Sequence, residues 1–267
     1  MTGTTAGHDQ DRGNTPAAML AEGREEYARE ARRGRAGSEA AARYAARMDG
    51  VVQAVVESAR GLTATPVAVC ALGGYGRQAL CLHSDIDLLI VFDGAIGDAE
   101  ERFVNAVLQP LWDLRLALGQ HVRELSEFGE PDVTNPEFLL AFLDLRPIAG
   151  DASVFDRLAL FARDARYLRS AVDPLMALVA ERHHEFNDTL YQLEPDIKSA
   201  PGGLRDVVAA RHLRLLRPDV ASRENGAAAA RLDEAEDFIL RIRSVLHLHA
   251  GRDLNHLTHE LQGALVR

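Results

Sequence analysis

The sequence lacks several features that define special classes of protein. It has 2 cysteines, Cys70 and Cys81, among 267 residues, so the fold needs no disulfide framework. No stretch approaches the ~18 consecutive apolar residues of a membrane span, and the polar start MTGTTAGHDQDRGNTP has no apolar core like that of a secretory signal. These absences predict a soluble, cytoplasmic protein with free thiols and no membrane partner.

Positive charge is also scarce. Lys and Arg number 30 against 40 Asp and Glu, which gives a net charge of −10, so we expect no nucleic-acid partner. All but one of the basic residues are arginine. The exception, Lys198, is predicted to stand where a compact ammonium is needed, either on a triphosphate oxygen or on a nearby carboxylate of Glu194 or Asp196.

Hydropathy patterning predicts an α+β fold. Residues 1–15 are interpreted as a disordered tail, and residues 16–135 as a small α/β unit preceded by two helices that break near Gly34 and Gly37. Strands are expected over 66–72, 86–92 and 118–125, with a helix over 100–117. Residues 136–267 are expected to be all-helical, with helices over 136–148, 153–167, 171–190, 204–216 and 231–250.

The stretch ALGGYGRQALCLHSDIDLLIVF, residues 71–92, carries the chemistry. Gly73, Gly74 and Gly76 remove side chains from a turn after a strand, which lets backbone N–H groups approach an anion such as a triphosphate. Asp85 and Asp87 share one face of the next strand, where two carboxylates repel each other unless a cation lies between them. Hard oxygen ligands suit Mg²⁺. A surface pair of aspartates is the alternative, and the glycine turn nearby favours the metal site.

These residues resemble a known family. Gly-Gly-x-Gly-Arg, a short spacer and Ser-Asp-x-Asp-Leu-Leu are the signature of the polymerase-β-like nucleotidyltransferase superfamily. The sequence of this stretch is similar in particular to that of the bacterial PII-protein uridylyltransferase/uridylyl-removing enzymes. Two more stretches support this narrower resemblance, LWDLRLALGQHVREL at 111–125 and YQLEPDIKSAPGGLRD at 191–206. The resemblance covers roughly residues 40–262.

The resemblance implies a nucleotidyltransferase domain over 16–135, a helical domain over 136–267, and Mg²⁺-dependent transfer of UMP from UTP to a tyrosine of a PII-type signal protein. Asp85 and Asp87 would be the catalytic residues and metal ligands. Arg77 would either reach a phosphate oxygen or anchor the turn through a carboxylate. The residues expected to bind the nucleotide are Gly73, Gly74, Gly76, Arg77, Ser84 and Lys198.

The sequence departs from the family pattern at two acidic positions. Ala79 and Ala117 stand where the family has glutamates, and the acids nearby in sequence are Asp113, Glu124 and Asp144. Two alternatives therefore stay open: an adenylyltransferase acting on glutamine synthetase or a small acceptor with ATP, and a catalytically silent nucleotide-binding regulatory module.

The second activity of the family, removal of UMP, needs clustered His and Asp metal ligands, and the histidine pairs of this sequence have no carboxylate or cysteine framework beside them. We therefore expect no UMP removal by this chain. It is interpreted as an N-terminal fragment or the product of a truncated gene.

Overall fold

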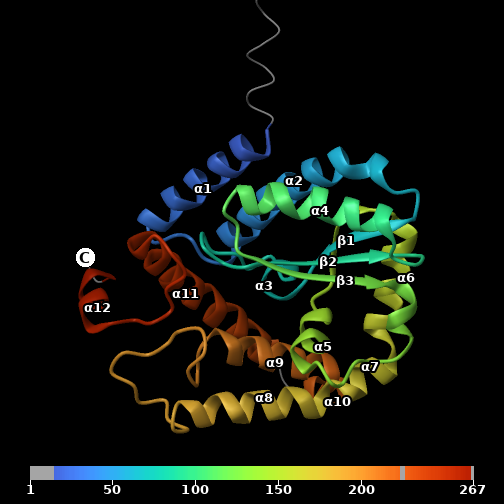
Figure 1. Cartoon of the computed structure of the whole chain (residues 1–267). Helices are drawn as coiled ribbons and strands as arrows, with labels where there is room; N and C mark the ends of the chain where they lie inside the picture. The colour runs from blue at the N-terminus through green and yellow to red at the C-terminus, as the bar shows by residue number, and fades with distance from the viewer. Residues whose placement is uncertain (1–14, 223–225, 266–267) are drawn as a thin grey trace, which may run out of the picture.

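A computed structural model describes residues 15–222 and 226–265 (Figure 1). The expected tail over 1–15 lies almost entirely outside the described residues. The first part of the chain contains α1 (Pro16–Arg32), α2 (Ser38–Ala59), η2 (Arg60–Leu62), β1 (Val67–Ala71), α3 (Gly73–Gly76), β2 (Ile86–Phe92), α4 (Asp98–Asp113), β3 (Leu118–Glu124) and η3 (Leu125–Gly129). The rest contains α5 (Pro136–Phe142), β4 (Arg146–Gly150), α6 (Ala152–Arg163), α7 (Ala165–Ser170), α8 (Val172–Glu185), α9 (Leu204–Leu216), α10 (Pro218–Ala221), α11 (Gly226–Ala250) and α12 (His259–Leu265).

Local sequence explains where several helices begin. Pro16 occupies the first turn of α1, where its missing N–H costs nothing, and the Thr15 hydroxyl accepts from Ala18 N at 3.3 Å. Pro136 starts α5 in the same way, with the Asn135 side chain accepting from Phe138 N at 3.1 Å. These caps fix the entry of each helix.

The four strands form one mixed sheet in the order β3-β2-β1-β4. β2 runs parallel to β3, whereas β1 is antiparallel to both β2 and β4. The three expected strands are thus confirmed, as is the α+β class. The short glycine turn expected after β1 is the four-residue helix α3.

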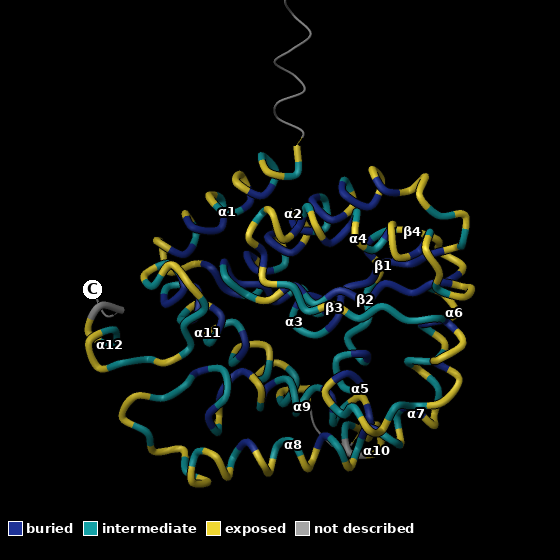
Figure 2. The backbone as a smooth tube through the Cα atoms, viewed as in Figure 1, coloured by how far each residue is buried: buried dark blue, intermediate teal, exposed yellow. Residues whose placement is uncertain are grey.

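The sheet separates two apolar layers. Ile86, Leu88 and Ile90 of β2 pack toward α2 and α4, while Leu89 and Val91 face the opposite layer, which α5, α6, α7 and α8 help to build. Figure 1 shows α2 and α4 above the sheet and α5, α8 and α9 below it, and Figure 2 shows β1 and β2 as buried. The face that carries Leu89 also carries Asp87.

The expected helix over 136–148 is wrong in its second half. α5 ends at Phe142, and Arg146–Gly150 is the edge strand β4, paired with β1. Residues 136–267 are therefore not entirely helical, and the division at residue 135 stays a prediction. The helices expected further along the chain are present, except that 153–167 is divided into α6 and α7.

Among residues 15–222 and 226–265, no helix combines the length and the apolar character that a bilayer crossing demands.

Candidate active site

Two carboxylates stand together where β2 begins. Asp85 immediately precedes the strand and Asp87 is its second residue, so both belong to the same face of the sheet. Asp85 is exposed and Asp87 is half-buried. Burial, and then the charge of Asp85, raise the pKa of Asp87 above its usual value. A divalent cation between the carboxylates would relieve that repulsion, so the pair fits a magnesium ion.

Two glycines leave room for the Asp87 carboxylate. Gly119 of β3 is its partner in the parallel ladder, and a Cβ atom on Gly119 would overlap Asp87 Oδ1. A Cβ on Gly73 would lie 3.3 Å from Asp87 Oδ2, and the φ of +52° at Gly73 is a conformation that glycine favours. The carboxylate thus occupies a cradle that any side chain at 119 would fill.

The glycine-rich helix α3 is held at its C-terminal end. Arg146 donates to the carbonyl oxygens of Tyr75 and Gly76, both at 3.2 Å, and its guanidinium forms a two-pronged pair with Asp49 at 2.7 and 3.0 Å. Gly76 packs so closely against the backbone of Asp144 that no Cβ atom fits. Gly76 N donates to Leu72 O at 2.8 Å, and the N–H groups before it in α3 have no acceptor within the helix, which suits an anion.

Arg77 anchors this turn. Its guanidinium pairs with the Asp144 carboxylate. The same carboxylate lies 3.0 Å from His212 Nε2, within hydrogen-bond distance. The carboxylate alternative for Arg77 is therefore present in the structure, and its direct contact with a phosphate stays a prediction. Asp144 joins α3, the segment after α5, and α9.

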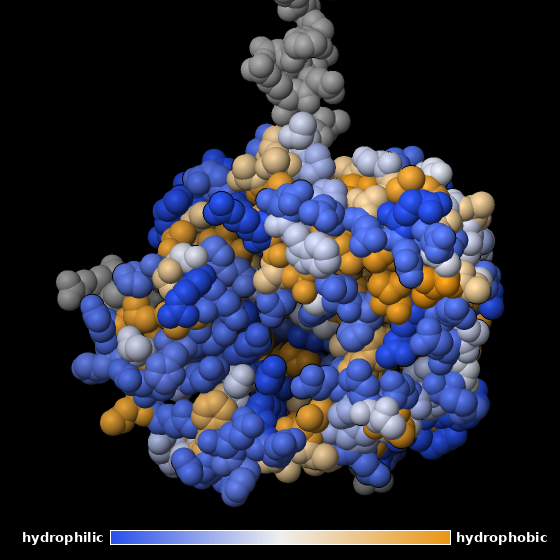
Figure 3. Space-filling model, in the orientation of Figure 1, coloured by the Kyte–Doolittle hydropathy of each residue, from blue (hydrophilic) through white to orange (hydrophobic). Residues whose placement is uncertain are grey.

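A cavity of about 810 Å³ contains the carboxylate pair. Figure 3 shows the surface hollowed at the centre of this face, with both hydrophilic and apolar side chains at its floor. Its apolar wall includes Phe138, Leu175, Val179 and Leu204. All the residues expected to bind the nucleotide or metal line it except Gly76, namely Gly73, Gly74, Arg77, Ser84, Asp85, Asp87 and Lys198.

Two cations from the helical region line the same cavity as the carboxylates. Lys198 and Arg205 line it, and within the described part of the chain neither makes an ion pair. Burial, and then the charge of Arg243, lower the pKa of Lys198. Neither acid predicted as a partner holds this ammonium: Asp196 accepts from the backbone N–H groups of residues 198 and 199, and Glu194 accepts from His259 N.

Asp206, at the end of the PDIKSAPGGLRD turn, has a structural role. Asp206 accepts from Arg182 at 2.7 Å and from Gly202 N at 2.7 Å, and it lies 2.9 Å from His183 Nε2. One carboxylate therefore ties α8 to the start of α9 and fixes the turn that presents Lys198.

We expect Lys198→Met to weaken nucleoside triphosphate binding by roughly 10-fold, because it removes a charged hydrogen-bond donor from the cavity. The melting temperature without nucleotide should stay unchanged, because no carboxylate is left unpaired. Titration calorimetry and a thermal melt measure both quantities. Arg32→Met on the exposed face of α1 is the control. A lower melting temperature with unchanged affinity would contradict a phosphate-directed role.

The two positions at which the family pattern has an acid and this chain has alanine, Ala79 and Ala117, both lie at the candidate site. Ile86 N donates to Ala117 O at 2.8 Å, which places Ala117 beside Asp85 just before the β2–β3 ladder begins, and Ala79 lines the cavity. Glu124 lies at the far end of β3, where it accepts from Ile96 N, and Asp113 ends α4. Of the three nearby acids, Asp144 lines the cavity, although Arg77 and His212 already engage it.

No group of three or more His, Cys, Asp or Glu side chains suited to a metal occurs in the described ranges. The Asp85–Asp87 pair therefore offers two protein ligands, and nucleotide phosphates would complete the coordination of a magnesium ion.

Sequence reasoning missed four features of the site. Gly119 was visible only as part of a resembling stretch, and Arg205 only as one charge in a crowded turn. His212 and Arg243 gave no local signal, since they lie on helices far along the chain from the residues that they contact. A fixed spacing cannot reveal such partners.

Comparisons with known proteins bear out the family resemblance. A family model described as GlnD PII-uridylyltransferase matches residues 171–267. A bifunctional uridylyltransferase/uridylyl-removing enzyme of Methylococcus capsulatus is 36% identical over 216 residues, which are 77% of this chain and 25% of that protein. One from Pseudomonas fluorescens is 32% identical over 230 residues, 82% of this chain and 25% of the relative. The chain thus spans about a quarter of the length of these relatives.

Proposed function

Because the chain belongs to the GlnD PII-uridylyltransferase family, we propose that its cavity binds a magnesium-bound nucleoside triphosphate and catalyses transfer of UMP from UTP to a tyrosine hydroxyl of a PII-type signal protein. One observation supports this most strongly: Asp85 and Asp87 line the same cavity as Lys198 and Arg205, two cations that form no ion pair within the described residues. Carboxylates suit the metal, and cations suit the phosphates.

In the proposed reaction the oxygen of the acceptor hydroxyl bonds to the α-phosphorus, the bond from that phosphorus to the bridging oxygen breaks, pyrophosphate leaves, and the hydroxyl proton passes to water. Magnesium, when bound, would neutralise charge on the phosphates. Asp85 and Asp87 would hold that magnesium ion, while Lys198, Arg205 and the first N–H groups of α3 would hold the β- and γ-phosphates. The apolar wall would exclude water from the reacting atoms.

This chain carries Ala117 beside Asp85, where a carboxylate could have accepted the proton of the acceptor hydroxyl. We expect Ala117→Glu to raise Mg²⁺-dependent transfer by about 10-fold or more, because a positioned base contributes ~10²–10⁴-fold in favourable cases. The assay measures transfer to a purified PII protein. Ala117→Gln, of the same size and without charge, is the control. Equal rates in the two variants would contradict the role of the charge.

The absence of that third carboxylate favours a second candidate function, a module that binds the nucleotide without turning it over. Labelled UTP and ATP, offered with a PII protein and with glutamine synthetase, separate the possibilities. Label from UTP in the PII protein supports the proposal, and label from ATP in glutamine synthetase supports adenylylation. Nucleotide binding without incorporation would overturn the proposed transfer and support the silent module.

A further inference from the structure

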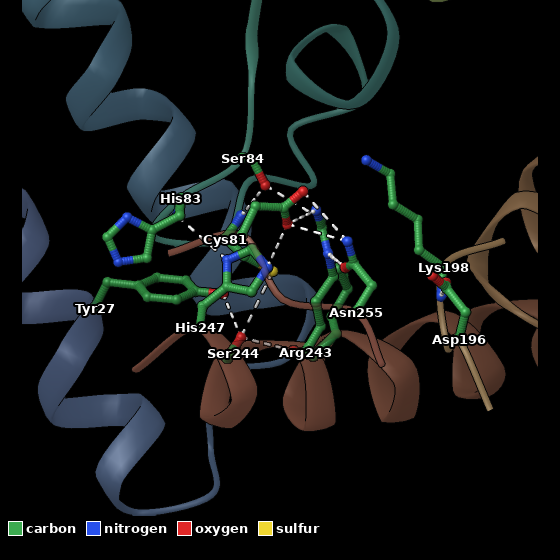
Figure 4. Close-up of polar contacts among 12 residues, drawn as sticks. Tyr27, Cys81, His83, Ser84, Asp196, Lys198, Arg243, Ser244, His247 and Asn255 are labelled. Atoms are coloured by element: carbon green, nitrogen blue, oxygen red, sulfur yellow. Dashed lines mark hydrogen bonds and ion pairs between the residues drawn. The ribbon is translucent and has the colours of Figure 1, made fainter. Parts of the chain in front are cut away.

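Arg243 of α11 is a buried arginine at the edge of the cavity, with an exposed fraction of 4%. Its guanidinium donates in three directions: to Ser84 Oγ at 3.2 Å, to Asp253 Oδ1 at 3.0 Å and to Asn255 Oδ1 at 2.7 Å. Figure 4 shows Arg243 and Asn255 between Ser84 on one side and Lys198 with Asp196 on the other. A planar fork with several donors fits this arrangement, and a lysine would not.

The Ser84 contact bears directly on Asp85. Cys81 N donates to Ser84 Oγ at 2.9 Å and Ser84 N donates to Cys81 O at 3.0 Å, so residues 81–84 form a closed turn. Asp87 lies inside the β2–β3 ladder, whereas Asp85 lies just before it. The position of Asp85 therefore depends on this turn, and Arg243 holds the turn from outside.

The Asn255 contact bears on Lys198. Ile197 N donates to Asn255 O at 2.8 Å, and Asp196 pairs with His256 in an isolated antiparallel bridge. The segment that carries Lys198 is thus bound to the segment that Arg243 holds through the Asn255 side chain.

Residues of α11 next to Arg243 also hold this helix against the rest of the protein. Ser244 Oγ lies 2.6 Å from Tyr27 Oη of α1, where either hydroxyl can donate, and it lies within hydrogen-bond distance of Ala36 O, at 2.9 Å. One turn on, His247 Nδ1 accepts from His83 N at 3.3 Å, next to Ser84. The helix therefore cannot shift without disturbing residues 81–84.

We propose that Arg243 is a positioning residue, which fixes Asp85 and Lys198 relative to each other across the cavity by holding Ser84 on one side and Asn255 on the other. This inference rests on the proposed function, because the two residues would meet the same magnesium-bound triphosphate. Arg243 itself is occupied by Ser84, Asp253 and Asn255, so it acts through its neighbours.

The test measures the dissociation constant of UTP by calorimetry with and without Mg²⁺, together with the melting temperature. The constant without Mg²⁺ divided by the constant with Mg²⁺ gives a ratio that measures how much the metal tightens binding. This ratio reports whether the carboxylates and the cations meet one metal-bound triphosphate. We expect Arg243→Lys to reduce this ratio by ~10-fold, as for the loss of about one charge-assisted hydrogen bond. Arg241→Gln is the control on the same helix, because Arg241 is half-exposed and pairs with Asp237.

Two milder variants keep the inference testable if Arg243→Lys does not fold. Ser84→Ala and Asn255→Ala each remove one of the side chains that accept from Arg243, and we expect each to reduce the ratio by several-fold. A lower melting temperature with an unchanged ratio in both would overturn the positioning role alone. If the unaltered chain binds UTP no better with Mg²⁺, the proposed function fails and the inference falls with it.

Discussion

Asp87→Asn and Asp85→Asn are each expected to lower Mg²⁺-dependent nucleotidyl transfer by ~10²-fold or more, the effect of losing one preorganised transition-state contact. Asparagine keeps the shape of the side chain and removes the charge that would bind the metal. Burial and the charge of Asp85 raise the pKa of Asp87, so a bound metal ion would stabilise its charged form. The rate of UMP incorporation at saturating UTP measures the effect, and nucleotide affinity with Mg²⁺ measures the same loss in binding.

The matched control is Asp93→Asn, just beyond the other end of β2, where the exposed carboxylate pairs with Arg157 at 2.5 Å. It should leave transfer unchanged, because an exposed pair of this kind contributes little. Undiminished transfer and metal-dependent binding in either Asp85→Asn or Asp87→Asn would show that the metal lies elsewhere.

Local pattern was sufficient to predict the central strands of the sheet. β1 is a continuous apolar run between turn residues, and so is β2 apart from Asp87; such runs are typical of buried strands. The sequence did not predict β4, because Arg146–Gly150 is a short edge strand with Ile148 as its one buried residue. Its pairing with β1, some 80 residues earlier in the chain, defines it as a strand, and hydropathy patterning does not register a partner so distant.

The candidate site divides in the same way. The carboxylate pair and the glycine turn lie within one stretch, so the sequence places them together. The unusual composition drew attention to Lys198, but the sequence suggested Glu194 or Asp196 as partners, and both are taken by backbone N–H groups. His212 and Arg243 enter the site through the folding of distant helices, and nothing in their own neighbourhoods indicates this.

Gly119→Ala is expected to lower transfer nearly as far as Asp87→Asn, by up to ~10²-fold, because the new methyl group would occupy the space of Asp87 Oδ1. The overlapping atom is the end of a side chain, so the carboxylate can rotate away and the melting temperature should change little. The loss therefore comes from a misplaced carboxylate in a folded protein. Gly129→Ala is the control, since no atom lies within 4 Å of a Cβ atom there.

Combining the two substitutions separates misplacement from any other effect at position 119. If Gly119→Ala acts through Asp87, the double variant Gly119→Ala/Asp87→Asn should transfer UMP no more slowly than Asp87→Asn alone, because residues that act as one unit are not additive. Losses that multiply would mean that Gly119 matters for another reason, such as the close approach of substrate to β3. Full transfer by Gly119→Ala would show that the position of the Asp87 carboxylate is not critical, which the proposed metal site does not allow.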